Sequence, residues 1–439
     1  MKMTLCITCF MFTALACNIL QTSNITPAPS STPTLTLPLA PTPTQPSTST
    51  LTPLPTPKAT STPVAPQPVE KAGPFRLVIS LADLLPDPDA DVQVKALADG
   101  SVWLITSQEV LRWDGQIWET VLSESEDMLA AVDDDGQVWV LRQDMSKIDA
   151  WQDGKWTTYG NESGWTNASI SEVGRWWAPV PWRATNSAGE KIWFPMETDV
   201  RLFDGKRWTL HTLEEMGFPL MDSEEIGIVH TLTTPKDSTE MWVGECYYSG
   251  PGPMGGKGVR WFNGKTWQGE AAPVGSSCVP VIEVDSAGNV WLGAPDVVWR
   301  YESASQMWTS FYLPEALLLD FNFTLPRQLM VDGAGDVWVM MQMCGGASCD
   351  NPAYLYRIHN GEWSLAIDSQ DWSMPPKQLA LDGSGQGWLF WDGTVYRLEG
   401  ETLQPAASLV ARSVDVSPDG RVWAVAQYED DLALWVLEP

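Results

Sequence analysis

The sequence contains few of the residues that most hydrolases and metalloenzymes need. Only three of its 439 residues are histidines, and His211, His230 and His359 lie too far apart in the chain to suggest a shared metal site. No serine-hydrolase elbow, phosphate-binding loop or zinc-protease motif occurs. These absences argue against the common hydrolase, nucleotide-binding and metalloprotease classes.

Positive charge is also scarce. The chain has 26 Lys and Arg residues against 55 Asp and Glu residues, a formal net charge of −29. Such a surface repels nucleic acid and anionic lipid, so we expect neither to bind the folded part. The acidic residues are spread through turns, which is typical of a solubilising surface. Asp133-Asp-Asp-Gly136 resembles part of a calcium loop, and a structural calcium ion is the alternative to ordinary turn chemistry.

No apolar run is long enough to cross a membrane, but a short one follows Lys2 at the N-terminus. Residues 1–16 have the pattern of a signal peptide, ending in small residues before Cys17. Ala14-Leu15-Ala16 fits ordinary cleavage, and with Cys17 it also resembles a bacterial lipobox. That resemblance implies a lipid-modified Cys17, and hence a membrane attachment through the lipid alone.

The next segment, residues 17–74, is dominated by Thr, Pro, Ser, Ala and Leu. Its stretch 21–74 holds 14 of the 34 prolines. This composition cannot bury a core, so we expect an extended, disordered linker with a reach on the order of 150 Å. A stalk of this kind is useful to a domain that stands off a surface, which favours the lipoprotein interpretation.

One phrase recurs eight times in the remainder, namely a turn followed by two residues and a Trp. Most copies contain Gly in the turn, and the Trp residues are spaced by 35 to 54 residues. The eight copies end at Trp103, Trp139, Trp193, Trp242, Trp291, Trp338, Trp388 and Trp423.

Repeats of this period predict a β-propeller. In the first copy we expect strands over 92–98, 102–106, 110–113 and 117–122, joined by Asp-Gly turns. Four strands, a to d, make one antiparallel blade. The sequence therefore predicts an all-β domain over 75–439 with eight blades, or seven if one repeat is degenerate.

The eighth repeat lacks its fourth strand, because the chain stops after the strand expected over 432–437. The apolar run Phe75–Leu81 has no partner of its own. We expect it to pair there as the missing strand and close the ring. The repeated Trp residues, on this interpretation, fill the space between blades and do not form a binding array.

The repeat resembles the two-component-regulator propeller family. Arg112-Trp113-Asp114-Gly115 and Leu202-Phe203-Asp204-Gly205 carry the resemblance, following the Asp-x-x-Gly-x-Val-Trp phrase. It implies a bacterial, extracytoplasmic propeller of the kind found in ligand-sensing receptors. No kinase or DNA-binding segment follows the repeats, so any signal is expected to pass through a partner.

Strand direction alternates within a blade, so the a–b and c–d turns share one rim, here called the turn rim. The b–c and d–a connections share the other, the insertion rim. All long insertions fall on the insertion rim, where binding usually resides. They cover residues 161–177, 213–226, 245–258, 312–325 and 343–354.

Four cysteines lie on the insertion rim, an even number that suits an oxidising compartment. We expect Cys246 to pair with Cys278, joining two loops, and Cys344 to pair with Cys349, closing one loop. The bridges either preorganise a binding surface or merely staple long insertions.

Aromatic residues gather on the same rim and suit sugars or apolar peptides, although some could belong to strands. The candidate ligand-binding residues are Trp165, Trp176, Trp177, Tyr247, Tyr248, Tyr312 and Trp372, with Asp350 as a polar candidate. No catalytic residue is assigned.

The sequence thus predicts a monomeric, lipid-anchored, extracytoplasmic propeller that binds a glycan or a protein without catalysis and without a cofactor. Two alternatives stay open. One is a polysaccharide lyase or hydrolase that uses carboxylates of the rim or channel. The other is a structural adaptor in an envelope complex.

Overall fold

The structure is a computed structural model of the chain. It divides into residues 1–54 and a compact unit formed by residues 55–439. The residues that the structure describes all belong to the second unit. They are 62–63, 71–85, 91–142, 145–166, 185–187, 191–219, 226–235, 238–248, 253–268, 277–317, 323–344, 353–367, 378–391, 393–399, 402–428 and 431–438.

These residues form eight antiparallel sheets, each with four core strands, and two short 3-10 helices. Blade 1 contains β4 (Gln93–Ala96), β5 (Val102–Ile105), β6 (Glu109–Trp113) and β7 (Ile117–Ser123), and blade 2 contains β8 (Met128–Val132), β9 (Val138–Arg142), β10 (Ile148–Gln152) and β11 (Lys155–Tyr159). Blade 3 contains β12 (Thr185–Ser187), β13 (Lys191–Pro195), β14 (Asp199–Phe203) and β15 (Trp208–Thr212). Blade 4 contains β16 (Ile226–Thr233), β17 (Met241–Tyr248), β19 (Val259–Phe262) and β20 (Trp267–Gln268).

Blades 5 to 8 follow the same plan. Blade 5 contains β21 (Val281–Val284), β22 (Val290–Ala294), β23 (Val297–Glu302) and β24 (Met307–Tyr312), and blade 6 contains β25 (Phe323–Val331), β26 (Val337–Cys344), β27 (Ala353–His359) and β28 (Glu362–Ile367). Blade 7 contains β29 (Gln378–Leu381), β30 (Gly387–Trp391), β31 (Thr394–Glu399) and β32 (Thr402–Ser408). Blade 8 contains β33 (Ala411–Val416), β34 (Val422–Tyr428), β35 (Asp431–Leu437) and β3 (Phe75–Ser80). Strand β18 (Pro253–Gly255) is added to β17, and the 3-10 helices are η1 (Asn161–Ser163) and η2 (Glu315–Leu317).

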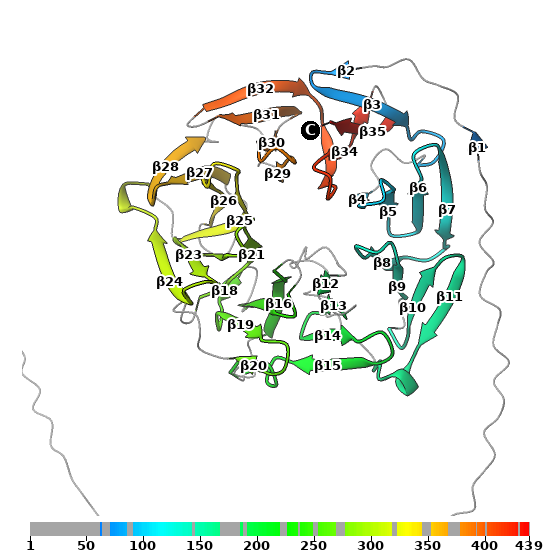
Figure 1. Cartoon of the computed structure of the whole chain (residues 1–439), viewed down its shortest axis with the longest axis horizontal. Helices are drawn as coiled ribbons and strands as arrows, with labels where there is room; N and C mark the ends of the chain where they lie inside the picture. Colours follow the sequence, from blue (N-terminus) through cyan, green and yellow to red (C-terminus); the bar gives the residue numbers. More distant parts are fainter. Residues whose placement is uncertain are drawn as a thin grey trace, which may run out of the picture. The chain divides into compact units, whose positions relative to one another are not determined.

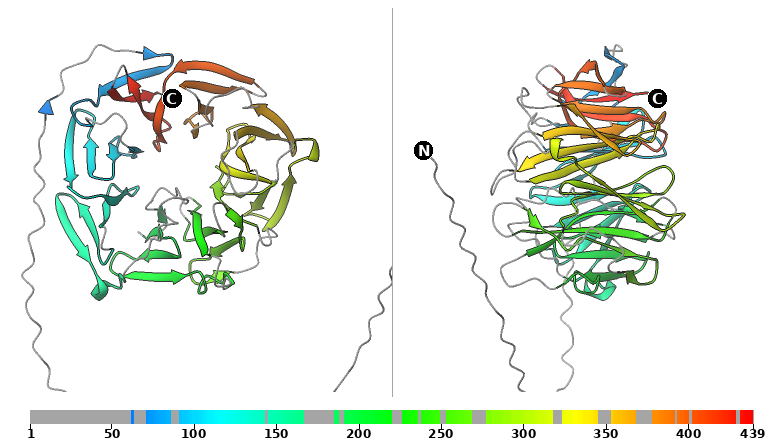
Figure 2. Two further views of the ribbon diagram at one scale, coloured as in Figure 1. Left: turned by 180° about the vertical axis from the view of Figure 1, so that it is seen from behind. Right: turned by 90° about the vertical axis from the view of Figure 1, so that its left-hand side faces the viewer.

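The eight sheets stand side by side in a ring, with the first strand of each blade innermost and the last outermost (Figure 1; Figure 2). The predicted eight-bladed β-propeller is confirmed, and the seven-bladed alternative is wrong. The first blade shows why the prediction worked. Gly100 and Gly115 adopt φ values of 84° and 101° at the two turns where a positive φ was expected.

The N-terminal strand closes the ring, as the sequence predicts. β3 pairs antiparallel with β35, and Leu77 lies opposite Trp435. Blade 8 is also joined to blade 1 through its innermost strand. The Ser413 hydroxyl accepts from Val94 N at 3.0 Å, and the Asp415 carboxylate accepts from Ala96 N at 2.8 Å.

Two short strands from the segment that precedes residue 75 pair with strands of the propeller. β1 (Thr62–Pro63) pairs with the outer strand β7, and β2 (Lys71–Ala72) pairs with β3. Both additions lie on outer edges, where a proline is tolerated because no further strand needs its N–H. The sequence reasoning missed them because composition alone does not reveal an available sheet edge.

All eight repeat Trp residues are buried, none more than 6% exposed. They are therefore part of the scaffold, as the sequence predicts. In four blades an Asp lies six residues before the repeat Trp. Its carboxylate accepts one hydrogen bond from the indole N–H of that Trp and others from backbone N–H groups of the turn between them. The four pairs are Asp133–Trp139, Asp285–Trp291, Asp332–Trp338 and Asp382–Trp388, at 2.9 to 3.0 Å.

Candidate functional site

The insertion rim is uneven, because two of its blades have much longer inner strands than the blade between them. In blade 4, β16 and β17 have eight residues each, and in blade 6, β25 and β26 have nine and eight. The corresponding strands of blade 5, β21 and β22, have four and five. At about 3.3 Å per residue, the flanking hairpins extend roughly 10 Å further along the strand direction than blade 5 does.

These extended hairpins replace part of two predicted loops. The insertions expected at 245–258 and 312–325 contain the end of β17, strand β18 and the start of β25. The pairing continues to Ile226 opposite Tyr248, and to Phe323 opposite Cys344. Two insertions are therefore built partly from sheet, which fixes their backbones more firmly than a loop would.

A disulfide bond fixes the blade 4 hairpin to the adjoining blade. Cys246 and Cys278 are joined, with their Cα atoms 4.4 Å apart, and both are buried. The bond links β17 to the segment that leads into β21, as predicted. Val279 N also donates to Glu245 O at 3.2 Å, so the two segments are held by backbone contacts as well.

Gly256 lies where the β18 segment packs very closely against the two segments that the disulfide bond joins, and this close packing explains why the residue is a glycine. A Cβ atom on Gly256 would lie 2.6 Å from the Cα of Cys278 and 2.6 Å from the carbonyl oxygen of Glu245. Any larger side chain would push the β18 segment away from the bridge. The position therefore keeps this part of the rim compact.

Two of the predicted aromatic candidates have described side chains that reach the surface. Tyr247 is half-buried, and the Lys257 ammonium lies 5.2 Å from its ring centroid. Tyr312 ends the outer strand of blade 5 and is 64% exposed. Both belong to the part of the insertion rim formed by blades 4 and 5. Tyr248 lies at the end of β17, opposite Ile226, but its side chain is outside the described set.

Trp165 is not a surface residue, so its assignment as a ligand-binding residue is wrong. It is fully buried, and its indole N–H donates to Met145 O at 3.2 Å. The 3-10 helix η1 ends two residues before it, and the ring centroids of Trp165 and Trp208 lie 4.9 Å apart. The large apolar ring is therefore used to seal blade 3 against blade 2.

The remaining sequence candidates stay predictions. Cys17, Trp176, Trp177, Cys349, Asp350 and Trp372 lie outside the described residues, as does the side chain of Cys344 at the end of β26. The second predicted disulfide bond is therefore untested.

The insertion rim of blades 3 and 4 contains buried arginines that the sequence reasoning missed. Arg201 and Arg260 occupy the same repeat position, two residues before the Phe of the c–d turn, and are 2% and 9% exposed. Each arginine side chain donates to a backbone carbonyl in the loop that precedes the first strand of its own blade. Arg201 donates to Thr166 O at 2.6 Å, and Arg260 donates through two nitrogens to Gly217 O at 2.9 and 3.1 Å.

Carboxylates accompany these arginines. Asp199 accepts from Arg201 Nε at 3.0 Å, although burial raises the pKa of Asp199 above its ordinary value. Glu245 is fully buried and accepts from Lys257 N at 2.5 Å. Buried charges of this kind are costly unless well paired. Their concentration here marks the insertion rim of blades 3 and 4 as a rigid, polar framework.

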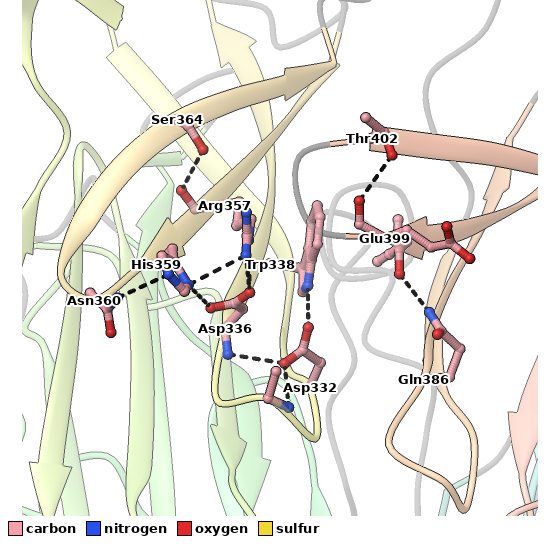
Figure 3. A network of polar contacts seen from close by, with 12 residues as sticks. Asp332, Asp336, Trp338, Arg357, His359, Asn360, Ser364, Gln386, Glu399 and Thr402 are labelled. Carbon is pink, nitrogen blue, oxygen red and sulfur yellow. Dashed lines mark hydrogen bonds and ion pairs between the residues drawn. The ribbon is translucent and has the colours of Figure 1, made fainter.

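The turn rim holds a polar network of a different kind in blade 6 (Figure 3). Asp336 accepts from Arg357 Nε at 2.8 Å and contacts His359 Nδ1 at 2.5 Å. Burial favours the neutral acid, but the hydrogen bonds from His359 and Arg357 outweigh it and hold the pKa of Asp336 below its ordinary value. His359 Nε2 lies 2.9 Å from Asn360 Nδ2 and accepts from it.

A similar arrangement recurs in blade 7, where Gln386, Arg397 and Glu399 take the equivalent positions. Arg397 Nε donates to Gln386 Oε1 at 3.0 Å and lies 3.2 Å from Glu399 Oε1. Blades 6 and 7 thus use different side chains for the same set of contacts at equivalent positions. We therefore assign these polar networks to the scaffold of the turn rim. Asp133 likewise serves a turn, accepting from Asp135 N, Gln137 N and the Trp139 indole.

Within the described ranges, no group of three or more His, Cys, Asp or Glu side chains is placed to hold a metal ion. Over the same ranges, no helix has the length and apolar character needed to span a membrane.

Comparison with known proteins gives similarities of fold. No family model and no curated protein matches the chain. Similar solved structures include virginiamycin B lyase from Staphylococcus aureus, at 12% identity and a TM-score of 0.44, covering 83% of this chain and 100% of that one. Another is the extracellular domain of a hybrid two component system of B. thetaiotaomicron, at 13% identity and a TM-score of 0.40, covering 79% of this chain and 51% of that one.

A third is PorZ, a bacterial surface component of the type-IX secretion system of Porphyromonas gingivalis, at 15% identity and a TM-score of 0.37, covering 81% of this chain and 59% of that one. At this level the similarities do not extend to an activity, and they do not establish the family that the repeat resembles.

Proposed function

We propose that this chain is an extracytoplasmic binding protein, anchored by lipid at Cys17, whose insertion rim binds a glycan or protein ligand. Its role is sensing or scaffolding, without catalysis. The observation that carries the proposal is the disulfide bond between Cys246 and Cys278, which fixes an extended hairpin beside the short blade 5. Disulfide bonds persist in oxidising compartments, which supports a location outside the cytoplasm.

The described surface of this rim suits a ligand with both apolar and polar faces. Tyr312 offers an exposed ring, and Tyr247 offers a ring whose position is fixed by Gly255 and Lys257. Aromatic side chains with a polar end are favoured in binding surfaces because they give large contact areas at low entropic cost. The buried arginines hold the neighbouring loops in place, so little ordering is needed when a ligand binds.

Binding is tested with the mature protein on a glycan array and by pull-down from native membranes. We expect a retained glycan or a captured envelope protein, with the signal reduced at least tenfold in Tyr247→Ala and Tyr312→Ala. Lys206→Ala, an exposed residue of the turn rim, is the matched control. Loss of signal in the control alone would place binding on the other rim, and release of shortened products from a retained glycan would replace binding by catalysis.

The lipid anchor is tested separately. Radiolabelled palmitate should label the wild-type protein in bacterial cells and not Cys17→Ala, and the variant should appear in the soluble extracytoplasmic fraction. If the wild-type protein is not labelled, Cys17 is not lipid-modified and the signal peptide is removed by ordinary cleavage.

A further inference from the structure

The outer edges of the blades differ in how well they are protected against pairing. The last strand of each blade lies at the outside of the ring, where one side of its backbone faces away from the sheet (Figure 1). Such an edge readily pairs with a strand of another protein, and proteins usually prevent this by covering, shortening, bending or charging the edge strand. Among the described residues, every outer strand except one has such a protection.

Several outer strands are covered or very short. β1 pairs with β7, and β2 pairs with β3, so segments of the same chain occupy these two edges. The loop at Gly164 closely approaches the edge of β15, because a Cβ atom on this glycine would lie 2.4 Å from Trp208 O. β20 has only two residues. These edges leave little room for another strand.

Other outer strands contain a charge, a proline or a bulge. Exposed charged residues begin two of them, Lys155 in β11 and Glu362 in β28. β32 contains Pro405, and register shifts in β28 and β32 leave Ala366 and Ala406 as extra residues. Each of these features disfavours regular pairing along the edge.

β24, the outer strand of blade 5, has none of these protections. Its six residues, Met-Trp-Thr-Ser-Phe-Tyr, include no charge and no proline, and its pairing with β23 shows no register shift. In the part of the chain that the structure describes, β23 is the only strand that pairs with it. Met307 and Tyr312 are 63% and 64% exposed, more than any other large hydrophobic side chain described. An open edge in a chain that protects the others indicates an interaction surface.

The pairing of β24 shows which backbone groups face the open side. Leu313 N donates to Asp296 O at 2.9 Å, and the ladder between β24 and β23 continues from there without a shift. Hydrogen-bonded and non-hydrogen-bonded pairs alternate along an antiparallel ladder, so the N–H and C=O groups of Trp308, Ser310 and Tyr312 point away from β23. They form a row of donors and acceptors about 7 Å apart.

The side chains along this edge favour an uncharged partner strand. Trp308, Ser310 and Tyr312 share one face of the sheet, and Met307 and Thr309 lie on the other. Aromatic side chains pair favourably with β-branched ones across neighbouring strands. We therefore expect the middle of a partner strand to be rich in Val, Ile or Thr.

Acidic side chains flank the edge at both ends. Glu302 ends β23 beside the start of β24, and the exposed Glu315 follows β24 in η2. Arg300, also on β23, lies over the ring of Trp291, 5.6 Å from its centroid. With a net charge of −29 for the whole chain, these acids favour a partner strand with Lys or Arg at its ends and disfavour a second copy of this chain.

We propose that the open edge of β24 binds an extended segment of a protein partner, which adds a strand to blade 5 and has an uncharged, β-branched middle and basic ends. Backbone hydrogen bonds with Trp308, Ser310 and Tyr312 supply the affinity, and the flanking glutamates select the charge. β1 and β2 show that outer edges of this fold accept an added strand. The inference deepens the proposed function by stating how a protein ligand is held, and it rests on the ligand being a protein.

The binding of a labelled synthetic peptide to the mature protein, measured by fluorescence anisotropy, tests this. The peptide alternates Val and Thr and has Lys residues at both ends. We expect it to bind at least tenfold more tightly than the same peptide N-methylated at alternate residues, which keeps the side chains and loses backbone donors. Replacing the Lys residues by Glu should also weaken binding, and more strongly at low salt.

Two variants of Ser310 separate its backbone from its side chain. Ser310→Pro removes one N–H at the open edge, leaves the bonds to β23 in place, and should weaken binding tenfold or more. Ser310→Ala keeps that N–H and should bind as the wild type does. Melting temperatures show whether both have folded, and Pro405 shows that an outer strand of this fold accommodates proline. The comparison of the two peptides on the wild type depends on neither variant.

Equal binding by folded Ser310→Pro, equal binding of the N-methylated peptide, or no binding of either peptide would overturn the inference. A wild-type dimer that Ser310→Pro converts to monomers would make a second copy the occupant and overturn the assignment to a partner. A ligand that requires Tyr247 but binds Ser310→Pro as tightly as the wild type would contradict this inference alone and leave the proposed function standing.

Discussion

Leu77 and Trp435 face each other across the join that closes the ring, although they lie near opposite ends of the propeller. Both are buried in one cluster with Phe75 and Trp388. The strand that follows the linker therefore contributes directly to the core of the last blade. Ring closure makes the stability of the whole domain depend on residues at its N-terminal edge.

Truncating Phe75 tests this dependence. The ring is fully buried and lies 6.0 to 6.2 Å from the rings of Phe390 and Trp388. Phe75→Ala should cost about 3–5 kcal/mol of unfolding free energy in a urea titration. The adjacent Arg76→Ala removes only an exposed ion pair with Glu438 and should cost at most about 1 kcal/mol. Equal effects of the two variants would contradict closure by β3.

The hydrogen bond between an Asp and the repeat Trp predicts a second stability effect. Asp332 accepts from the Trp338 indole at 2.9 Å and from the backbone N–H groups of Ala334 and Asp336. Asp332→Ala leaves three donors without their acceptor and should lower the unfolding free energy by about 2–4 kcal/mol. Asp134→Ala, which removes an exposed partner of Lys95, is the control and should change it by less than about 1 kcal/mol.

The disulfide bond on the insertion rim gives a redox prediction. Cys246 and Cys278 are 32 residues apart in sequence, and closing a loop of that size stabilises a domain by about 2–4 kcal/mol. Dithiothreitol should lower the melting temperature of the wild type by more than that of the double variant Cys246→Ala/Cys278→Ala, in which any remaining effect comes from the predicted Cys344–Cys349 bond. Free thiols at both positions in the oxidised protein would refute the bridge.

His230 predicts a pH dependence with a definite sign. Burial lowers its pKa to about 4 in the folded protein from an ordinary value of 6.5, and its Nδ1 donates to Pro280 O at 3.2 Å. The unfolded chain therefore takes up a proton near pH 6.5 that the folded protein does not accept until about pH 4. Stability contributed by the neutral ring is complete above pH 6.5 and is lost as the pH falls from 6.5 to 4.

Urea titrations at pH 7 and pH 5 measure this effect. The wild type should lose more unfolding free energy between the two pH values than His230→Asn, which retains a donor for Pro280 O. Identical losses would show that His230 titrates normally in the folded protein.

The fold was predictable because its signals are local. The Gly turns, the alternating strands and the recurring Trp each act over a few residues, and Phe75–Leu81 stood out as a strand without a partner. The extended hairpins were missed for an equally local reason. Pro326 reads as a strand breaker, yet it is tolerated because it lies beside the bulge at Arg327.

The candidate site was predictable only in part. The number and placement of cysteines led to the Cys246–Cys278 pair, because an even set on one rim suggests bridges. Trp165 was misjudged, since nothing in its neighbours distinguishes an exposed loop Trp from one that turns inward. Arg260 reaches a carbonyl 43 residues earlier in the chain, and no local pattern reveals such a partner.

The central claim is that the insertion rim is the ligand-binding face. Hydrogen–deuterium exchange of the mature protein, alone and saturated with whichever glycan the array retains best, tests it most directly. The account predicts slower exchange in the peptides around Tyr247, Cys278 and Tyr312, with unchanged exchange in the turn-rim peptides around Lys206 and His359. Protection confined to the turn-rim peptides would contradict it.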